Sequence, residues 1–334
     1  MESKSVLACV VLLLPVLAGT PAAAQALDKV TAVIPQNSVF VLNWQGAKDA
    51  GIFKKHGIDL TVDVRPFAGF LAGLPSKQTL AATYPGLEAI DKINHGLDWA
   101  VIGGGLTVVQ EVIVRKDSPI KTLADLRGKR LGVWSTGAGG FKAARVAIMD
   151  AAGIDITKDT KLVQLAPPAL FKLLENGQVD AMFNISSFTV EAASHPDKFR
   201  AVFAPNDYWK KKTGYPIAWA APLVAWKSWV NENRARAEHY AEAVEESFRW
   251  LRKPENFEAA VKKYGTLASV SKPGQIAVYK KWLGEKRFFL AHWDQKVVDS
   301  QWQFLDTAKR YNMLSTVPDK AKHAMILEKP VTQN

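Results

Sequence analysis

The stretch "KRLGVWSTGAGGFKAARVAIMDAAG", residues 129–153, decides the fold class of this chain. An apolar run at 129–134 passes into six small residues at 135–140, and a segment with apolar residues at helical spacing then ends at Gly153. A strand, a glycine-rich turn and a helix in this order indicate an α/β protein. The turn also raises a functional question, because glycine-rich turns before helices often bind phosphate.

The same order of elements occurs twice along the chain. Each pass has a Gly-Ile-Asp after its first helix, at 57–59 and at 153–155. Alternating strands and helices indicate parallel sheets with right-handed crossovers, and the recurrence predicts two similar lobes. The predicted strands are 29–40, 58–64 and 97–105 in the first pass and 129–134, 161–167 and 178–187 in the second; the predicted helices are 42–57, 84–96, 141–153 and 168–177.

Two segments connect the predicted lobes. Residues 106–119 lead from the first to the second, and the apolar segment 216–230 is a candidate return crossover. Everything beyond it is helical in pattern and is expected to pack back on the first lobe. We therefore predict an α/β, two-lobed clamshell, in which each lobe is a central sheet flanked by helices and two crossings form a hinge. The predicted boundaries are a first lobe at 27–108, a second lobe at 109–221, and the return to the first lobe with the C-terminal helices at 222–334.

Residues 1–26 have the pattern of a cleavable signal peptide. Lys4 precedes an apolar run at 6–17, and residues 22–26 offer two A-x-A cleavage sites. The run is too short to span a bilayer, which disfavours the alternative of a membrane anchor. The single cysteine, Cys9, lies in this segment, so the predicted mature chain has no disulfide, thiol nucleophile or cysteine-bound metal. We expect export to the periplasm.

The net charge of +11 does not indicate a nucleic-acid-binding protein. The basic residues are scattered along amphipathic segments, and their densest cluster is "WKKK" at 209–212. No basic tract with interleaved aromatic residues is present, so a solvated surface that helps to attract anionic ligands is the better interpretation.

Ligands of open parallel sheets bind beyond the carboxyl ends of the strands. Four such turns are rich in Gly, Ser, Thr or Asn and carry no acid or base, at 36–38, 103–105, 135–140 and 184–187. The turn at 135–140 is not a P-loop, because Ala138 and Gly139 stand where Lys and Ser/Thr would be, and Lys142 replaces the last glycine of a dinucleotide fingerprint. Two interpretations of the turn remain. It binds a small anion through the unpaired N–H groups at the start of the helix, or it is an ordinary turn capped by Ser or Thr.

No catalytic or metal-binding set is recognisable in the sequence. None of the six histidines has a partner at metal-ligand spacing, and Glu111 is the one acid near the predicted cleft, to which we assign no catalytic role. An apolar lining with a few polar groups is usual for ligand sites. We therefore predict that Trp44, Trp134 and Trp219 form walls of the cleft.

The segments "DAGIFKKHGIDLTV", "SPIKTLADLRGKRLGV" and "LENGQVDAMF", with the leader, resemble the substrate-binding proteins of ABC importers of the sulfonate/nitrate/taurine type. The resemblance implies a periplasmic-binding-protein-like fold that captures a small solute by hinge closure and delivers it to a permease and ATPase in the inner membrane. We expect a monomer without cofactor or metal. No arginine occurs in the four turns, which argues against a strongly charged ligand held by two parallel hydrogen bonds from a guanidinium. We expect a small organic anion, a sulfonate or a carboxylate, with or without an aromatic body. The ligand contacts that the resemblance implies are Asn37, Ser38, Phe40, Gly103, Gly104, Ser135, Thr136, Gly137, Ala138, Asn184 and Ser186.

Two alternatives to transport stay open at this point. The fold is shared with enzymes of thiamine-pyrimidine synthesis, whose cysteine-rich motif is absent here, and an exported dehydratase-like enzyme would need Glu111, His195 or Asp207 in the cleft. A module that presents its ligand to a membrane sensor would differ only in its partner. On the transport hypothesis, Gly137→Asp is expected to abolish binding without unfolding the protein.

Overall fold

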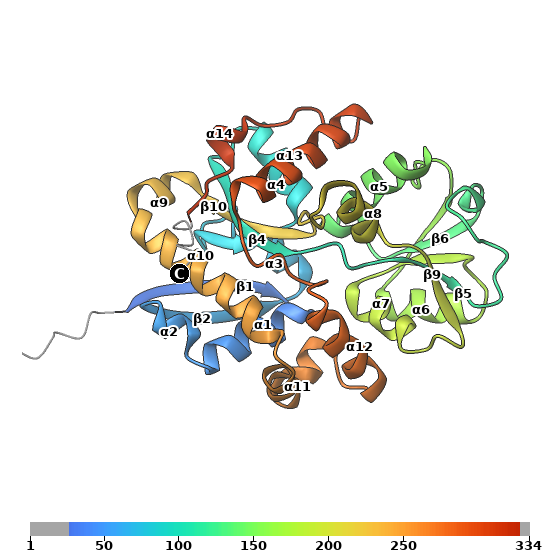
Figure 1. Cartoon of the computed structure of the whole chain (residues 1–334), viewed down its shortest axis with the longest axis horizontal. Helices are drawn as coiled ribbons and strands as arrows, with labels where there is room; N and C mark the ends of the chain where they lie inside the picture. Colours follow the sequence, from blue (N-terminus) through green and yellow to red (C-terminus); the bar gives the residue numbers. More distant parts are fainter. Residues whose placement is uncertain (1–26, 328–334) are drawn as a thin grey trace, which may run out of the picture.

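The computed structural model describes residues 27–327, so the predicted signal peptide lies outside the described residues. Two lobes lie side by side in Figure 1, with the N-terminal strands in one and the central third of the chain in the other. The strands of the first lobe are β1 (Asp28–Pro35), β2 (Ile58–Arg65), β3 (Ala81–Thr83), β4 (Trp99–Leu106) and β10 (Ala221–Trp226). Those of the second are β5 (Val112–Arg115), β6 (Arg130–Val133), β7 (Lys161–Gln164), β8 (Ala181–Phe183) and β9 (Phe199–Phe203).

The two lobes share one strand order. The second sheet runs β7-β6-β8-β5-β9; in the first, β2 pairs with β1, β1 lies beside β3, and the order continues β3-β10-β4. In each sheet the lobe's own four strands occur in the order second, first, third and fourth, and one further strand is inserted between the third and the fourth. The inserted strands are β10 in the first lobe and β5 in the second, and the shared order confirms the repeated plan. The expectation of purely parallel sheets is wrong, because β10 runs antiparallel to β3 and β4 and β5 runs antiparallel to β8 and β9. Each inserted strand follows a crossing between the lobes and so enters its sheet from the opposite end.

The helices agree in part with the sequence pattern. The helix predicted at 42–57 is two helices, because Gly51 adopts a φ of +76° between them. The helices that the sequence pattern did not predict include α3 (Phe67–Gly73), α7 (Ser186–Ala193) and α8 (Pro205–Thr213). The helices are α1 (Val39–Asp49), α2 (Ile52–Lys55), α3 (Phe67–Gly73), α4 (Gly86–Asn94), η1 (Ala124–Leu126), α5 (Gly139–Ala152), α6 (Pro167–Glu175), α7 (Ser186–Ala193), α8 (Pro205–Thr213), α9 (Lys227–Glu232), α10 (Arg234–Leu251), α11 (Pro254–Ala268), α12 (Pro273–Gly284), α13 (Gln295–Arg310) and α14 (Lys320–His323).

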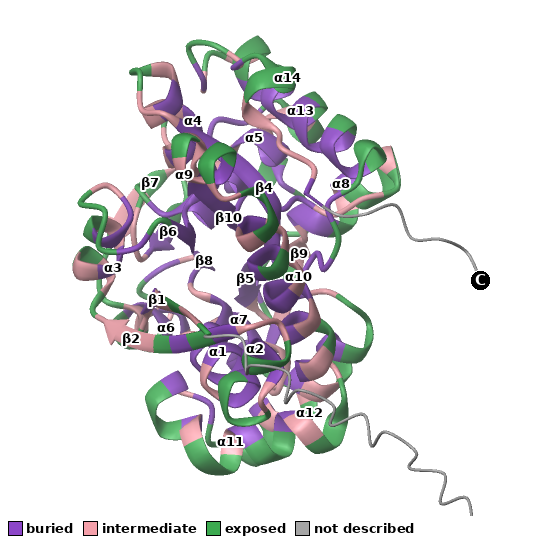
Figure 2. Ribbon diagram, turned by 90° about the vertical axis from the view of Figure 1, so that its left-hand side faces the viewer, coloured by how far each residue is buried: buried purple, intermediate pink, exposed green. Residues whose placement is uncertain are grey.

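The core of the first lobe is closed by C-terminal helices. Ala237, Tyr240, Ala241, Val244 and Phe248 recur at helical spacing on α10 and are all buried, and this face packs on α1 and β4. In Figure 2 the helices accordingly show buried inner faces and exposed outer faces. Burial of this face removes several large apolar side chains from water. Each Å² of apolar surface buried stabilises the fold by about 25 cal/mol, and this holds the C-terminal segment on the first lobe.

The chain crosses between the lobes twice, through residues 107–111 and 204–220. The two crossings are joined, since Val108 N donates to Ile217 O over 3.0 Å. These segments lie next to the boundaries expected at 108 and 221, and the extent of each lobe stays a prediction. A third connection comes from the C-terminal helices: α12 packs on α7, where Lys272 Nζ lies 2.5 Å from Glu191 Oε1, and α13 touches α5. The C-terminal helices therefore contact the second lobe as well as the first.

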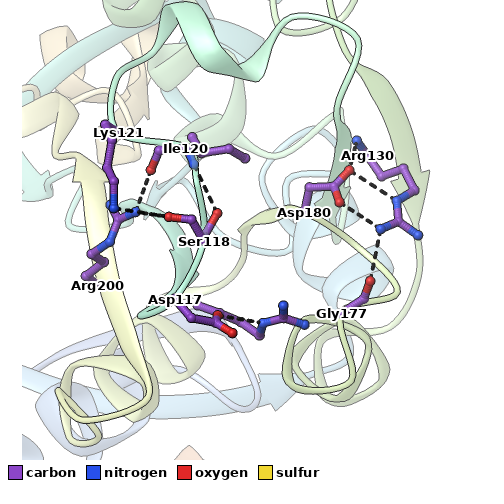
Figure 3. A network of polar contacts seen from close by, with 9 residues as sticks. Asp117, Ser118, Ile120, Lys121, Arg130, Gly177, Asp180 and Arg200 are labelled. Carbon is purple, nitrogen blue, oxygen red and sulfur yellow. Dashed lines mark hydrogen bonds and ion pairs between the residues drawn. The ribbon is translucent and has the colours of Figure 1, made fainter.

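Polar contacts at the amino ends of the second lobe's strands have a structural role (Figure 3). Arg130 donates through Nη2 to Asp180 Oδ1 over 2.7 Å and to Gly177 O over 2.9 Å, and its backbone N donates to Asp180. This pairing with the guanidinium lowers the pKa of the Asp180 carboxyl. Arg130 thus ties the start of β6 to the turn before β8, at the end of the sheet opposite the carboxyl ends.

Candidate functional site: a cavity between the lobes

A cavity of about 260 Å³ lies between the two lobes, at the carboxyl ends of β1 and β6. Six helices begin at its wall, because the lining includes the cap or first residue of each of α1, α3, α4, α5, α6 and α7. Helix starts carry partial positive charge and unpaired N–H groups, so the cavity is suited to an anion. The lining residues are Pro35, Gln36, Asn37, Ser38, Phe40, Phe67, Phe70, Pro85, Leu106, Gln110, Trp134, Ala138, Gly139, Gly140, Pro167, Ile185, Ser186, Ala220 and Ala221.

The start of α5 leaves its N–H groups available. Its cap residue is Ala138, which has no side chain that could accept from them, whereas Ser38 Oγ caps α1 by accepting from Phe40 N over 3.3 Å. The first residues of α5 are Gly139 and Gly140, and both line the cavity. Oxygen atoms of a ligand can therefore approach the first turn of α5 without displacing a protein partner.

Close packing requires the glycine at 139 and leaves little room beside the glycine at 140. A Cβ on Gly139 would lie 2.4 Å from Ala220 O and 3.1 Å from Pro85 Cα, so the helix start is pressed against the second crossing and the first lobe. A Cβ on Gly140 would lie 3.0 Å from the amide of Gln110. The bare backbone in this turn thus serves contact between the lobes as well as access for a ligand.

Aromatic side chains form much of the cavity wall. They are Phe40, Phe67, Phe70 and Trp134. Phe67 of the first lobe meets Trp134 of the second edge to face, with ring centroids 5.0 Å apart and an interplanar angle of 74°. This geometry is favourable for aromatic pairs, and here it joins the two lobes across the cavity.

The described lining residues include no ionisable side chain. Their polar groups are the amides of Gln36, Asn37 and Gln110 and the hydroxyls of Ser38 and Ser186. Asn37, at a φ of +56°, is held by Leu267 O, to which its N donates, and by the Ser269 hydroxyl, which donates to its Oδ1 over 2.9 Å. The site can therefore bind through hydrogen bonds and helix starts, but it offers no side chain for acid–base chemistry.

Six of the predicted ligand residues line this cavity: Asn37, Ser38, Phe40, Trp134, Ala138 and Ser186. The two other tryptophans do not. Trp44 is fully buried in the first lobe and stacks on Phe53, and Trp219 donates through Nε1 to Gln301 O over 3.1 Å. Both fill the core because their indoles are enclosed on every side, which a sequence pattern does not distinguish from a cavity wall.

The remaining predicted residues lie beside the cavity or elsewhere. Gly103 and Gly104 permit strand packing, since a Cβ on Gly104 would lie 2.0 Å from Leu290 O. Asn184 is buried and holds the turn before α7, donating to Pro167 O over 2.9 Å and accepting from Ile185 N. Ser135 Oγ accepts from Gly137 N, while Thr136 and Gly137 are exposed. The expectation for Gly137→Asp therefore loses its structural basis, because Gly137 is exposed and the turn meets the cavity only from Ala138 onward.

Several lining residues were missed by the sequence reasoning. Phe67 and Phe70 lie on α3, whose segment "FAGFLAG" is short and contains two glycines, so that it has no strong helical pattern. Gln110 lies in the first crossing between Val109 and Glu111, and no motif marks it. Gly139 and Gly140 belong to the glycine-rich turn itself, and only their contacts distinguish them from Gly137.

The acids and bases considered for an enzyme do not line the cavity. Glu111 pairs with Arg287, and burial raises the pKa of its carboxyl while the guanidinium opposes that rise. His195 lies 3.6 Å from Glu191, and Asp207 is exposed. Within residues 27–327, no cluster of His, Cys, Asp and Glu could hold a metal ion, and no helix is long and apolar enough to cross a bilayer.

Two α/β lobes of one strand order, with a ligand-sized cavity between them, define the class of periplasmic-binding-protein-like folds. The chain matches the model of the NMT1/THI5 like family over residues 44–256, more than half of its length, and therefore belongs to that family.

Solved structures have the same architecture. The periplasmic aliphatic sulphonate binding protein SsuA from Escherichia coli is 17% identical and has a TM-score of 0.68, with 92% of this chain and 96% of that chain covered. The alkanesulfonate-binding protein SsuA from Xanthomonas axonopodis pv. citri, bound to MOPS, is 14% identical with a TM-score of 0.62 and coverages of 90% and 96%. The desulfurization enzyme DSZB is 14% identical with a TM-score of 0.57 and coverages of 90% and 97%. The comparisons confirm the predicted fold class and the resemblance to sulfonate-type substrate-binding proteins.

Proposed function

We propose that this protein binds a small organic anion, a sulfonate or carboxylate with an apolar or aromatic body, between its lobes. The proposal places it as the solute-binding component of an ABC importer, exported to the periplasm and delivering its ligand as a monomer to a membrane permease and its ATPase. The observation that carries it is the cavity at which six helices begin and whose lining has no ionisable side chain. Sulfonate binding by the two SsuA proteins of the same fold supports the ligand class.

The lining favours an organic ligand over an inorganic one. Four aromatic rings and several aliphatic side chains surround the space, and an inorganic oxyanion would leave them without apolar contact. The volume of about 260 Å³ lies below the usual range of roughly 300–1,000 Å³ for ligand pockets, which favours a single ring over a larger body.

Binding without turnover follows from the same lining. DSZB shows that this fold also carries an enzyme, so the fold alone does not decide between binding and catalysis. A catalytic site needs an acid, a base or a nucleophile within hydrogen-bonding distance of the ligand. Here the lining residues include no acid, and no base that could activate the hydroxyls of Ser38 or Ser186, so the amides, hydroxyls and backbone N–H groups suit recognition.

A thermal-shift screen with charge-matched pairs tests the proposal. Benzenesulfonate and benzoate would be compared with their neutral counterparts benzenesulfonamide and benzamide, and with nitrate and taurine as small anions. A ligand present at 100 times its Kd stabilises the native state by about 2.7 kcal/mol, which raises Tm by roughly 5 °C for a chain of this size. Stabilisation by the aromatic anions alone is expected; stabilisation by the neutral amides to the same degree would refute anion binding, and turnover of a bound anion would refute the non-catalytic role.

A further inference from the structure

Gln110 is a buried lining residue whose amide oxygen has no hydrogen-bond partner among the described residues. The residue is 8% exposed, it lines the cavity, and its Oε1 is buried without a hydrogen bond from residues 27–327. The other polar side chains of the first crossing are engaged: the Thr107 hydroxyl donates to Arg287 O, and Glu111 pairs with the Arg287 guanidinium. Buried carbonyl groups are costly when unpaired, so they are normally satisfied in the state that functions.

The position of this amide relates it to the proposed anion site. A Cβ on Gly140 would lie 3.0 Å from both Oε1 and Nε2 of Gln110, so the amide lies directly against the first turn of α5. The same turn offers the uncapped N–H groups described above. A ligand whose anionic oxygens meet those N–H groups therefore brings its ring next to Gln110.

We infer that Gln110 selects a ligand that carries an N–H or O–H donor on its body in addition to the anionic group. The donor hydrogen-bonds to Gln110 Oε1 when the ligand is bound. Resting on the proposed function, this narrows the ligand class to hydroxy- or amino-substituted aromatic sulfonates and carboxylates. A ligand without the donor leaves the buried carbonyl unpaired and binds more weakly.

Isosteric ligand pairs test the inference on the whole protein. The three aminobenzenesulfonates would be compared by calorimetry with the three toluenesulfonates, in which a methyl group of similar size replaces the amino donor. At least one amino isomer is expected to bind ten-fold or more tightly than its methyl counterpart. Equal affinity within all three pairs overturns the inference while leaving the proposed function intact; failure of every sulfonate and of benzoate to bind contradicts the proposed function itself.

A variant identifies Gln110 as the source of the preference. Gln110→Met keeps the length of the side chain and removes both polar ends. It is expected to bind the methyl series at least as tightly as the unchanged protein, with the amino preference reduced to less than two-fold, and its Tm without ligand should be equal or higher because an unpaired polar atom is gone. If the variant still prefers the amino ligands, the role of Gln110 is overturned. An equal loss of affinity for the amino and the methyl ligands also overturns it, because the amide N–H groups would then hold the sulfonate. If the variant fails to fold, the preference measured in the unchanged protein decides.

Discussion

Gly139→Ala is expected to weaken ligand binding by forcing the start of α5 away from its neighbours. The added Cβ would lie 2.4 Å from Ala220 O and 3.1 Å from Trp219 O, and both are backbone atoms that cannot rotate away. Restoring ordinary contact needs a shift of about 1 Å, and overpacking of this kind costs about 1–3 kcal/mol of stability. The same shift lengthens N–H···O bonds from about 2.9 Å to nearly 4 Å, and the loss of one bond to a charged oxygen, about 1.5–3 kcal/mol, raises Kd roughly 10- to 150-fold.

Gly137→Ala is the matched control, because it lies two residues earlier in the same turn. A Cβ there would meet only Ser135 Oγ at 3.7 Å, and the residue is exposed. Calorimetric titration with the aromatic anion of largest thermal shift, together with urea unfolding, would give Kd and the free energy of unfolding for both variants. Wild-type affinity in Gly139→Ala, or an equal loss in Gly137→Ala, would show that contact between α5 and the second crossing does not shape the site.

Three further outcomes follow from the structure. Phe67→Ala removes the aromatic contact between the lobes, worth about 0.5–1.5 kcal/mol, and should raise Kd for the same anion by about two- to ten-fold with little change in Tm; an unchanged Kd would mean that the contact does not favour the bound state. Lys272→Met leaves the buried Glu191 carboxylate without the lysine cation and should lower the free energy of unfolding by about 1–3 kcal/mol. If the ion pair is the cause, the double variant with Glu191→Gln should restore most of this loss. The hydrogen bonds of Arg145 hold the pKa of the Asp155 carboxyl well below its usual value. This pair therefore stabilises the fold above about pH 4 and loses its contribution as the pH falls further. The difference in urea stability between wild type and Asp155→Asn should shrink at low pH, and a constant difference from pH 7 to pH 3 would contradict the pairing.

Much of the fold could be predicted from local pattern. Strand and helix periodicity placed β1, β2, β4 and β6 to β8, and the repeated Gly-Ile-Asp indicated two lobes. The short elements β3, α3 and α7 were missed because three to eight residues carry too little periodicity. The antiparallel direction of β5 and β10 depends on how each crossing enters the opposite sheet, which a pattern along the chain does not record.

The candidate site was predictable in its position but only partly in its members. Chain order alone indicated that polar turns at strand ends would meet, and turns around Ser38, Ala138 and Ser186 do line one cavity. Which glycine in the turn is required was not predictable, since Gly137 and Gly139 differ only in the backbone that faces them.

The sequence by itself determined the α/β class, the duplicated lobe and a cleft chemistry without charged groups, because periodicity and residue type are local properties of the chain. The tertiary structure alone decided that Trp44 and Trp219 belong to the core, that Phe67 meets Trp134, and that Gln110 faces the start of α5. The physical reason is that burial and unpaired hydrogen-bonding capacity depend on neighbours that are distant in the chain. Whether an aromatic ring packs in a core or lines a cavity is settled by which segments surround it.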